Sequence, residues 1–287
     1  MIKDRMGNVV SSDDTQDKTL TFLYEKPLGK LLSKLLVRKF VSNLGRIYME
    51  SPLSKGRIDK LVKTHNIDMS EYEQREFSSF NDFFTRKILP DKRIVDMDSD
   101  SIVSPADSKL TVYDIDEDSK YQIKGCEYSI KSLLGGDEAL AKEYLGGKCL
   151  VYRLTVDNYH RYCYPDGGTE IENRFIPGVY HTVNPIATEK IDVYGKNCRE
   201  LTLLDTDNFG RVAYIEVGAM MVGRINNSHK TRFERGEEKG FFSFGGSTII
   251  LLYKKDTIVV DDDIMINSKS EIETVVRYGE RVGRRGE

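Results

Sequence analysis

The amino-acid sequence predicts an α+β protein, in which a helical N-terminal region packs on a predominantly antiparallel β body. Apolar residues recur at helical spacing in the first ninety residues. After Pro90 the chain changes to short apolar or alternating runs that are separated by glycine pairs. We therefore expect two parts, a helical region of residues 1–90 and a β-rich domain of residues 91–287.

The composition is that of a folded protein. The chain has 287 residues, of which 39% are hydrophobic and 31% charged. A net charge of -3 argues against a general nucleic-acid binder, which usually carries a basic patch. The longest apolar runs, such as residues 247–253, are far shorter than the roughly 20 residues that a membrane-spanning helix needs.

The cysteines and the N-terminus indicate a reduced, cytosolic setting. Residues 1–17 are polar and lack the apolar stretch of a secretory signal, so export is not expected. Four widely separated cysteines form no C-x-x-C pair, which indicates neither a zinc site nor a disulfide framework: Cys126, Cys149, Cys163 and Cys198.

The segment from Lys26 to Arg46 predicts an amphipathic helix. It contains six basic residues and no acidic one, and apolar residues recur at every fourth position: Leu28, Leu32, Leu36 and Phe40. Lysines and an arginine with the same spacing lie roughly 200° round the helix from them. Such a helix fits an anionic bilayer surface, or its leucines pack on the protein core while its lysines are solvated.

Further elements follow in order. Residues 54–64 are expected to be helical after a Ser-Pro turn, and Ser79 is expected to cap a helix that begins with Phe80. Beyond Pro90, only residues 137–144 predict a helix. The expected strands are 101–103, 108–113, 149–155, 170–177, 211–217 and 248–253.

One short segment has the local chemistry of a self-cleavage site. Gly246 leaves its carbonyl group sterically open, and Ser247 places a hydroxyl group one residue further on, so an N-to-O acyl shift is feasible. On local sequence alone, a glycine turn that enters a strand explains the same residues.

A serine needs a base and an orienting carboxylate to become a nucleophile. His160 follows an apolar strand and is a candidate base, although a structural histidine would look the same. Asp107, two residues after Pro105, is a candidate carboxylate, although aspartate also caps turns. Two other histidines, His65 and His229, look like surface residues.

Four motifs together resemble the phosphatidylserine decarboxylase family, and they occur in its order over most of the chain. They are FNDFFTRK at residues 80–87, SPAD at 104–107, YHR at 159–161 and GST at 246–248. The resemblance implies that Asp107, His160 and Ser247 form a relay for self-cleavage between Gly246 and Ser247. It makes residues 91–287 the catalytic domain.

One residue departs from the family pattern. Many bacterial relatives have a second histidine three residues after the first, where this sequence has Cys163. Either His160 serves both self-cleavage and decarboxylation, or His181 or Cys163 takes over one of these duties. We favour His160 for both.

The resemblance implies a covalent pyruvoyl cofactor derived from Ser247. Attack of the serine oxygen on the Gly246 carbonyl gives an ester, and β-elimination and hydrolysis then leave chains 1–246 and 247–287 and release ammonia. The pyruvoyl ketone is expected to form a Schiff base with the amine of phosphatidylserine and to accept the electrons left by carbon dioxide, which yields phosphatidylethanolamine. Neither pyridoxal phosphate nor a metal is implied.

The expected partners are phosphatidylserine, the protein's own two cleaved chains and an anionic membrane surface bound through Lys26 to Arg46. A homo-oligomer is compatible with the sequence, and nucleic acid is not expected. The expected location is the cytoplasmic face of the cell membrane, as a peripheral protein. Two rival interpretations are a pyruvoyl decarboxylase of soluble amino acids and a non-catalytic β-rich module.

Overall fold

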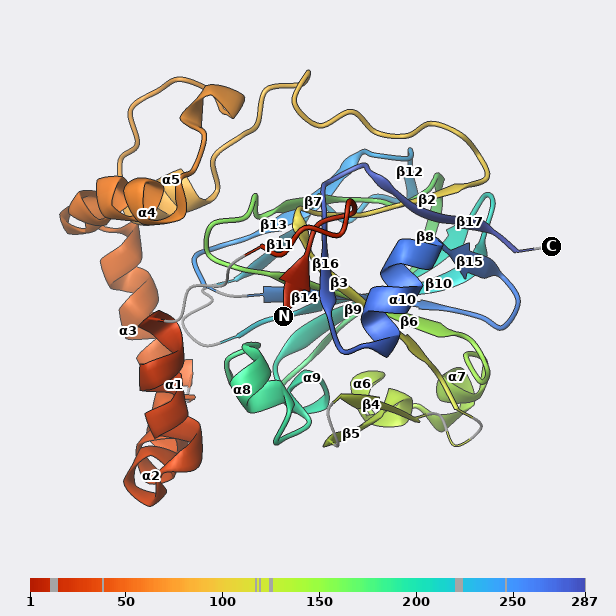
Figure 1. Ribbon diagram of the computed structural model, residues 1–287, viewed down its shortest axis with the longest axis horizontal. Coiled ribbons are helices and arrows are strands. Elements are labelled where there is room, and N and C mark those ends of the chain that lie inside the picture. Colours follow the sequence, from red (N-terminus) through yellow and green to blue (C-terminus); the bar gives the residue numbers. More distant parts are fainter. Residues whose placement is uncertain are drawn as a thin grey trace.

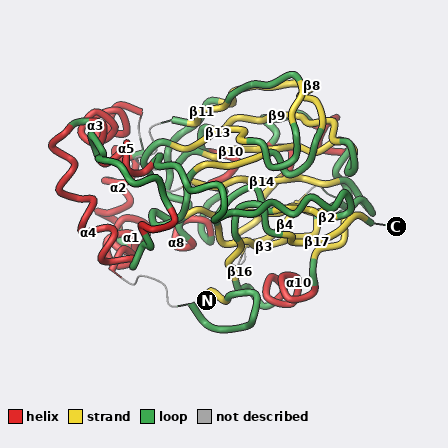
Figure 2. Tube along the Cα trace, turned by 90° about the horizontal axis from the view of Figure 1, so that it is seen from above, coloured by secondary structure: helices red, strands yellow, loops and turns green. Residues whose placement is uncertain are grey.

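The structure is a computed structural model. It describes residues 1–286 apart from 11–14, 38, 117, 119, 124–125, 220–223 and 246. Figures 1 and 2 show a group of N-terminal helices beside a body built mainly of strands. The predicted α+β class, with helices first and a predominantly antiparallel β body after them, is therefore confirmed.

Short helices make up the N-terminal group, and their ends follow ordinary capping rules. The Ser79 hydroxyl accepts a hydrogen bond of 3.1 Å from the backbone N–H of Asp82, as the sequence predicts for a cap. Asn66 ends its helix in the left-handed conformation, with φ of 51°. The elements are α1 (Thr15–Glu25), α2 (Pro27–Leu36), α3 (Lys39–Glu50), η1 (Pro52–Arg57), α4 (Ile58–His65), η2 (Met69–Glu71) and α5 (Phe80–Phe84).

The strands form one large sheet and three smaller ones. The large sheet has nine strands in the order β1-β16-β3-β6-β14-β10-β9-β8-β12, and the smaller sheets are β11-β13-β7, β15-β17-β2 and β4-β5. The strands are β1 (Ile2–Lys3), β2 (Ser101–Val103), β3 (Ser108–Asp114), β4 (Lys120–Ile123), β5 (Cys126–Ser129), β6 (Lys148–Leu154), β7 (Arg161–Cys163), β8 (Gly168–Ile176), β9 (Arg199–Thr206), β10 (Gly210–Val217), β11 (Ile225–Asn227), β12 (Arg232–Phe233), β13 (Glu238–Phe242), β14 (Ser247–Tyr253), β15 (Ile258–Val260), β16 (Glu273–Val276) and β17 (Arg281–Arg285).

Strand β14 occupies the centre of the large sheet. It pairs antiparallel with β6 on one side and with β10 on the other, and all seven of its residues are buried. The run of β-branched and leucine side chains from Thr248 to Leu252 suits a strand that is covered on both faces. Among the described strands, only β1 and β16 pair in parallel.

The sequence predicts the long strands better than the short helices. All six expected strands are present, with ends within two residues of the expected ones. The expectation of a single helix after Pro90 is wrong, because four more helices accompany α7 (Glu138–Lys142). Three of them have only four residues, too few to show a periodic pattern. The four are α6 (Ile130–Leu133), α8 (Pro185–Thr188), α9 (Val193–Lys196) and α10 (Asp262–Lys269).

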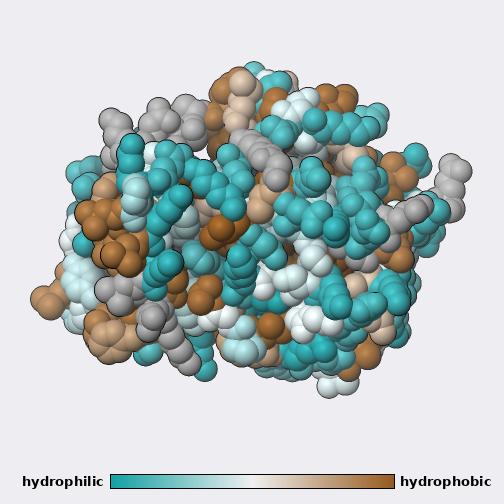
Figure 3. Space-filling model, turned by 90° about the horizontal axis from the view of Figure 1, so that it is seen from below, coloured by the Kyte–Doolittle hydropathy of each residue, from teal (hydrophilic) through white to brown (hydrophobic). Residues whose placement is uncertain are grey.

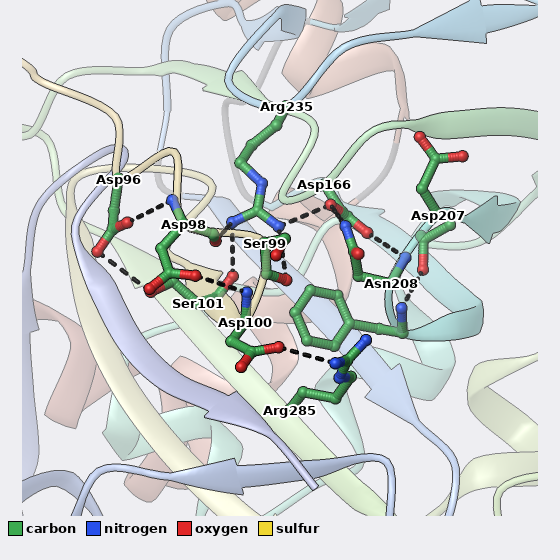
Figure 4. A network of polar contacts seen from close by, with 12 residues as sticks. Asp96, Asp98, Ser99, Asp100, Ser101, Asp166, Asp207, Asn208, Arg235 and Arg285 are labelled. Carbon is green, nitrogen blue, oxygen red and sulfur yellow. Dashed lines mark hydrogen bonds and ion pairs between the residues drawn. The ribbon is translucent and has the colours of Figure 1, made fainter.

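A polar network fastens the long segment between α5 and β2 to the sheet (Figure 4). Arg235 donates hydrogen bonds to the carbonyl oxygens of Asp98 and Ser101, and its guanidinium lies 2.8 Å from the carboxylate of Asp166. Asp166 also accepts two hydrogen bonds of 2.9 Å from Asn208. The side chains of Arg235 and Asp166 are only 6% and 1% exposed, so this pair lies out of water.

Loss of Arg235 is therefore expected to destabilise the fold. Arg235→Met leaves the Asp166 carboxylate buried without its cation and should lower the free energy of unfolding by about 3–5 kcal/mol. Urea denaturation of the Ser247→Ala chain measures this without interference from the expected cleavage. The control is Arg285→Met, whose ion pair with Asp100 is more than half exposed and should contribute less than about 1 kcal/mol. Equal effects of the two changes would contradict the assigned role of Arg235.

Candidate active site

The two residues at the centre of the candidate site come from strand ends. Ser247 is the first residue of β14 and lies opposite Leu154, the last residue of β6. His160 immediately precedes β7, and its carbonyl oxygen accepts a hydrogen bond of 3.0 Å from the N–H of Phe242 at the end of β13. Ser247 belongs to the large sheet and His160 borders the β11-β13-β7 sheet, so residues 87 positions apart meet between two sheets. Ser247 and His160 are both fully buried.

The imidazole of His160 is oriented toward Ser247. Its Nδ1 lies 3.4 Å from Ser247 Oγ, and its Nε2 lies 3.0 Å from the carbonyl oxygen of Thr155. A carbonyl oxygen only accepts hydrogen bonds, so Nε2 carries the ring proton and Nδ1 presents its lone pair to the serine hydroxyl. The ring of Phe84 in α5 stacks on the face of the imidazole, with the two ring centroids 3.9 Å apart and an interplanar angle of 28°. The ring is therefore held on its edge and on its face.

His160 is neutral at physiological pH. Burial lowers the pKa of this histidine to about 3, and the positive charges of Arg86 and Lys109 act in the same direction. The Thr155 carbonyl and the carboxylate of Asp157 favour the protonated ring but do not offset burial. The lone pair that faces Ser247 is thus available at pH 7.

The turn after β6 supports the imidazole. Asn158 Oδ1 accepts hydrogen bonds from the backbone N–H of Thr155 at 2.9 Å and from its hydroxyl at 3.0 Å. Lys109 of β3 donates to the same hydroxyl. Burial lowers the pKa of the Lys109 ammonium, although the carboxylate of Asp157 opposes that shift. These contacts fix the carbonyl group that selects the His160 tautomer.

Asp107 lies in a different set of contacts from the one expected. Arg93 donates to both of its carboxylate oxygens, at 2.6 and 2.8 Å for the shortest contacts, and the N–H of Tyr278 donates at 2.8 Å. Arg93 also pairs with Glu71 at 3.1 Å. No hydrogen bond or ion pair joins Asp107 to His160 in the part of the chain that the structure describes. The structure thus brings His160 and Ser247 together but leaves Asp107 outside this pair.

The alternative bases are less suited to the site. Cys163 is fully buried, and burial raises the pKa of its thiol to about 12. His181 lies 3.2 Å from the hydroxyl of Tyr24, and its pKa is lowered by burial. His65 is only part-exposed and lies 3.9 Å from Asp157 Oδ1, whereas His229 is on the surface, as expected. Gly246 lies outside the described residues.

Thr155, Asn158 and Lys109 are site residues that sequence reasoning missed. Thr155 acts through its backbone carbonyl, which every residue has, so no residue type signals it. Lys109 is the second residue after the SPAD motif. Its place in a predicted strand was the one feature of the sequence that could have indicated its burial. Among the residues described, no group of three or more His, Cys, Asp or Glu side chains is arranged to hold a metal ion.

Comparison with known proteins shows the family to which the chain belongs. The model of the phosphatidylserine decarboxylase family matches residues 80–284. Phosphatidylserine decarboxylase proenzyme 2 of Clostridium acetobutylicum is 47% identical over 265 residues, which cover 92% of this chain and 91% of that protein. The phosphatidylserine decarboxylase proenzyme of Ruminiclostridium cellulolyticum is 43% identical over 273 residues, which cover 93% and 91%. The corresponding proenzyme of Clostridium perfringens is 42% identical, with 93% and 92% covered. The chain therefore belongs to the phosphatidylserine decarboxylase family.

Proposed function

We propose that this chain is the precursor of a phosphatidylserine decarboxylase, and that it cuts itself between Gly246 and Ser247 to form its own pyruvoyl group. The enzyme converts phosphatidylserine to phosphatidylethanolamine and is a carboxy-lyase. The observation that carries the proposal is the 3.4 Å approach of the lone pair of His160 Nδ1 to Ser247 Oγ. A neutral histidine in this position is suited to remove the serine proton.

The first step converts a peptide bond into an ester. His160 Nδ1 takes the proton from Ser247 Oγ as that oxygen attacks the carbonyl carbon of Gly246. The bond between this carbon and the Ser247 nitrogen then breaks, and the proton passes from the imidazole to that nitrogen, which becomes a free amine. A base with a pKa of about 3 gives little driving force for proton removal, because general bases act best near the ambient pH. Each molecule needs this step only once, so a slow cleavage is sufficient.

The surroundings of Ser247 fit a small group built from the chain. Ser247 is fully buried, and the neutral imidazole beside it is covered by the ring of Phe84, so the reacting atoms are shielded from bulk water. A pyruvoyl group supplies a ketone that accepts the electrons left when carbon dioxide departs. His160 remains the proposed group that returns a proton to the product, and Thr155 keeps its ring in place.

For Asp107 we propose an indirect contribution to self-cleavage. It anchors the turn before β3 through Arg93 and the N–H of Tyr278, and β3 carries Lys109 to the hydroxyl of Thr155. A relay of hydrogen bonds from Asp107 to His160 stays a prediction. In this proposal the carboxylate is a positioning group for the turn that holds the imidazole.

Denaturing mass measurement tests self-cleavage directly. The native sequence should give chains 1–246 and 247–287, with the smaller one blocked to Edman degradation. Ser247→Ala and His160→Ala should each stay intact, whereas Cys163→Ser should be cleaved like the native chain, because its buried thiol is not the base. An intact native chain under active conditions would refute the proposal, and normal cleavage of His160→Ala would transfer the role of base to another residue.

The pH dependence of cleavage provides a second test. A general base works in its deprotonated form, which His160 retains down to its pKa of about 3 rather than the ordinary 6.5. The rate should therefore show no histidine titration between about pH 5 and pH 8. Cell-free synthesis followed by a jump in pH, with chain masses read over time, measures this. A twofold fall near pH 6.5 would show that the imidazole is solvated during cleavage.

Membrane association is the second part of the proposal, and it rests on the N-terminal helices. The predicted amphipathic segment is divided into α2 and α3, and several of its apolar side chains face solvent: Leu28 is 68% exposed, Leu31 66%, Phe40 71% and Leu44 53%. Leu36, by contrast, packs against the core. Figure 3 shows hydrophobic side chains gathered at the end of the molecule that these helices form.

Basic side chains accompany this apolar surface. Lys26, Lys30 and Lys34 are exposed, whereas Arg38, also part of the predicted stripe, lies outside the described residues. Each lysine near an anionic bilayer contributes about 1 kcal/mol of attraction. None of the described helices is long and apolar enough to cross a membrane. We propose peripheral binding to the cytoplasmic face, where phosphatidylserine is both the surface charge and the substrate.

Point substitutions test this contact better than deletion of residues 1–48, because that deletion also removes the buried side chains of Leu23 and Tyr24. Replacement of Leu31 and Phe40 by serine should reduce flotation with phosphatidylserine vesicles at least about fivefold, since two large apolar side chains no longer enter the bilayer. Self-cleavage should be retained.

The control for vesicle binding replaces Ile94 and Ile266 by serine. These residues are 81% and 65% exposed but lie outside the N-terminal helices. Vesicle binding should then stay unchanged. Equal losses in the two double variants would place the membrane contact elsewhere.

A further inference from the structure

Arg86 is a buried cation whose hydrogen-bonding capacity is largely unused. It follows α5 and is only 1% exposed, and its Nε has no hydrogen-bond partner. Its other contacts are weak, since the carbonyl oxygens of Phe83 and Asp157 are each 3.4 Å from the guanidinium nitrogens. The group lies over the rings of Tyr72 and Phe83, at 4.2 and 4.5 Å from their centroids. Within the described chain it forms no ion pair.

Among the described residues, the other arginines with almost fully buried side chains have close partners. Arg93, Arg153 and Arg235 pair with carboxylates at 2.6, 2.5 and 2.8 Å. Arg199 donates to three backbone carbonyl oxygens. A buried charge whose hydrogen-bond donors are incompletely used is costly, and an anionic ligand would complete its contacts. Arg86 therefore differs from its neighbours in being ready to bind an anion.

The position of Arg86 ties it to the reacting residues. Phe84, two residues earlier, stacks on His160, and the Asp157 carbonyl that Arg86 touches lies in the turn that leads to His160. The guanidinium charge is close enough to contribute to the lowered pKa of His160. Lys109 is the other buried cation near this imidazole, but it already donates to Thr155. Arg86, in contrast, has an Nε–H group without a hydrogen-bond partner.

We propose that Arg86 binds the phosphodiester of the phospholipid substrate and product while the amine of the substrate reacts at residue 247. A guanidinium matches two phosphate oxygens with parallel hydrogen bonds. The phosphate is present before and after the reaction, whereas an arginine on the carboxylate would stabilise the group that must leave and so oppose decarboxylation. The inference rests on the proposed role of Ser247.

Self-cleavage also provides a route to this site. In the uncut chain, Phe244 packs edge-on against Phe80 and Phe84, and its N–H donates to Asn81 Oδ1 at 2.8 Å. This segment is joined to β14 through residue 246, and the proposed cut removes that covalent link. The cut therefore leaves the ring of Phe244, which packs against the Phe84 ring that stacks on His160, near a free chain end.

Kinetics of Arg86→Gln and Arg86→Lys test the proposal in the full-length, self-cleaved enzyme. For Arg86→Gln, the KM for short-chain phosphatidylserine and the inhibition constant of short-chain phosphatidylethanolamine should both rise at least about tenfold. Arg86→Lys keeps the charge but loses the two-pronged geometry, so smaller increases are expected. Denaturing mass should show the same two chains as for the native sequence. Arg75→Gln is the control, because Arg75 is a more exposed arginine of the same segment that already pairs with Asp82 at 2.7 Å, and it should change neither constant.

Three results would distinguish phosphate binding by Arg86 from the alternatives. Values within twofold of the native enzyme for both constants would overturn the proposal. A raised KM with unchanged inhibition by phosphatidylethanolamine would also overturn it, since Arg86 would then bind the carboxylate. If neither variant is cleaved, the native enzyme is tested with two lipids that carry no amine, dihexanoyl phosphatidylglycerol, which has the phosphodiester, and dihexanoylglycerol, which lacks it. Inhibition by the first alone supports phosphate binding, and equal inhibition refutes it. An uncleaved native chain would refute the proposed function instead.

Discussion

The hydrogen bond between His160 Nε2 and the carbonyl oxygen of Thr155 determines what the imidazole can do. It places the ring proton on the side away from Ser247, so the nitrogen that faces the serine has a free lone pair. The carbonyl belongs to the residue after β6, and the serine begins the neighbouring strand β14. The register between β6 and β14 therefore helps to set the distance between the Ser247 hydroxyl and the imidazole that Thr155 orients. A slip of one residue would turn Ser247 to the other face of the sheet.

The charge distribution around this pair is unusual for a catalytic histidine. Among the described residues, no carboxylate hydrogen-bonds to the imidazole. Two buried cations, Arg86 and Lys109, lower the pKa of His160, as burial does. Nearby positive charges disfavour the imidazolium form of the ring but attract an anionic headgroup. In our proposal, the same charges keep the ring neutral before cleavage and attract the phosphate of the lipid after it.

Sequence reasoning could predict the strands around the site because long apolar runs have a clear signature, as in β6 and β14. It could also predict that Ser247 and His160 belong together, through the family resemblance of their motifs. It could not predict that the Asp107 carboxylate pairs with Arg93, because a carboxylate can pair with any of many basic residues and the sequence does not show which one lies nearest. The burial of Arg86 was equally hidden, since arginine is on the surface in most proteins.

An amphipathic stripe does not say whether its apolar side meets protein or lipid; the exposed Leu28 and Phe40 favour lipid.

The segment from Ser247 to the C-terminus is distributed through the fold. It supplies β14 at the centre of the large sheet, β16 near one edge, and β15 and β17 in a separate sheet. If the chain is cut as proposed, the hydrogen bonds of these strands to their neighbours still hold the two polypeptides together. Unfolding then becomes a one-way event, because two separate molecules would have to find each other and regain every register. The lifetime of the cleaved enzyme would then depend on a slow rate of unfolding rather than on a reversible folding equilibrium. Its fold can form only before the cut, while the protein is still one chain.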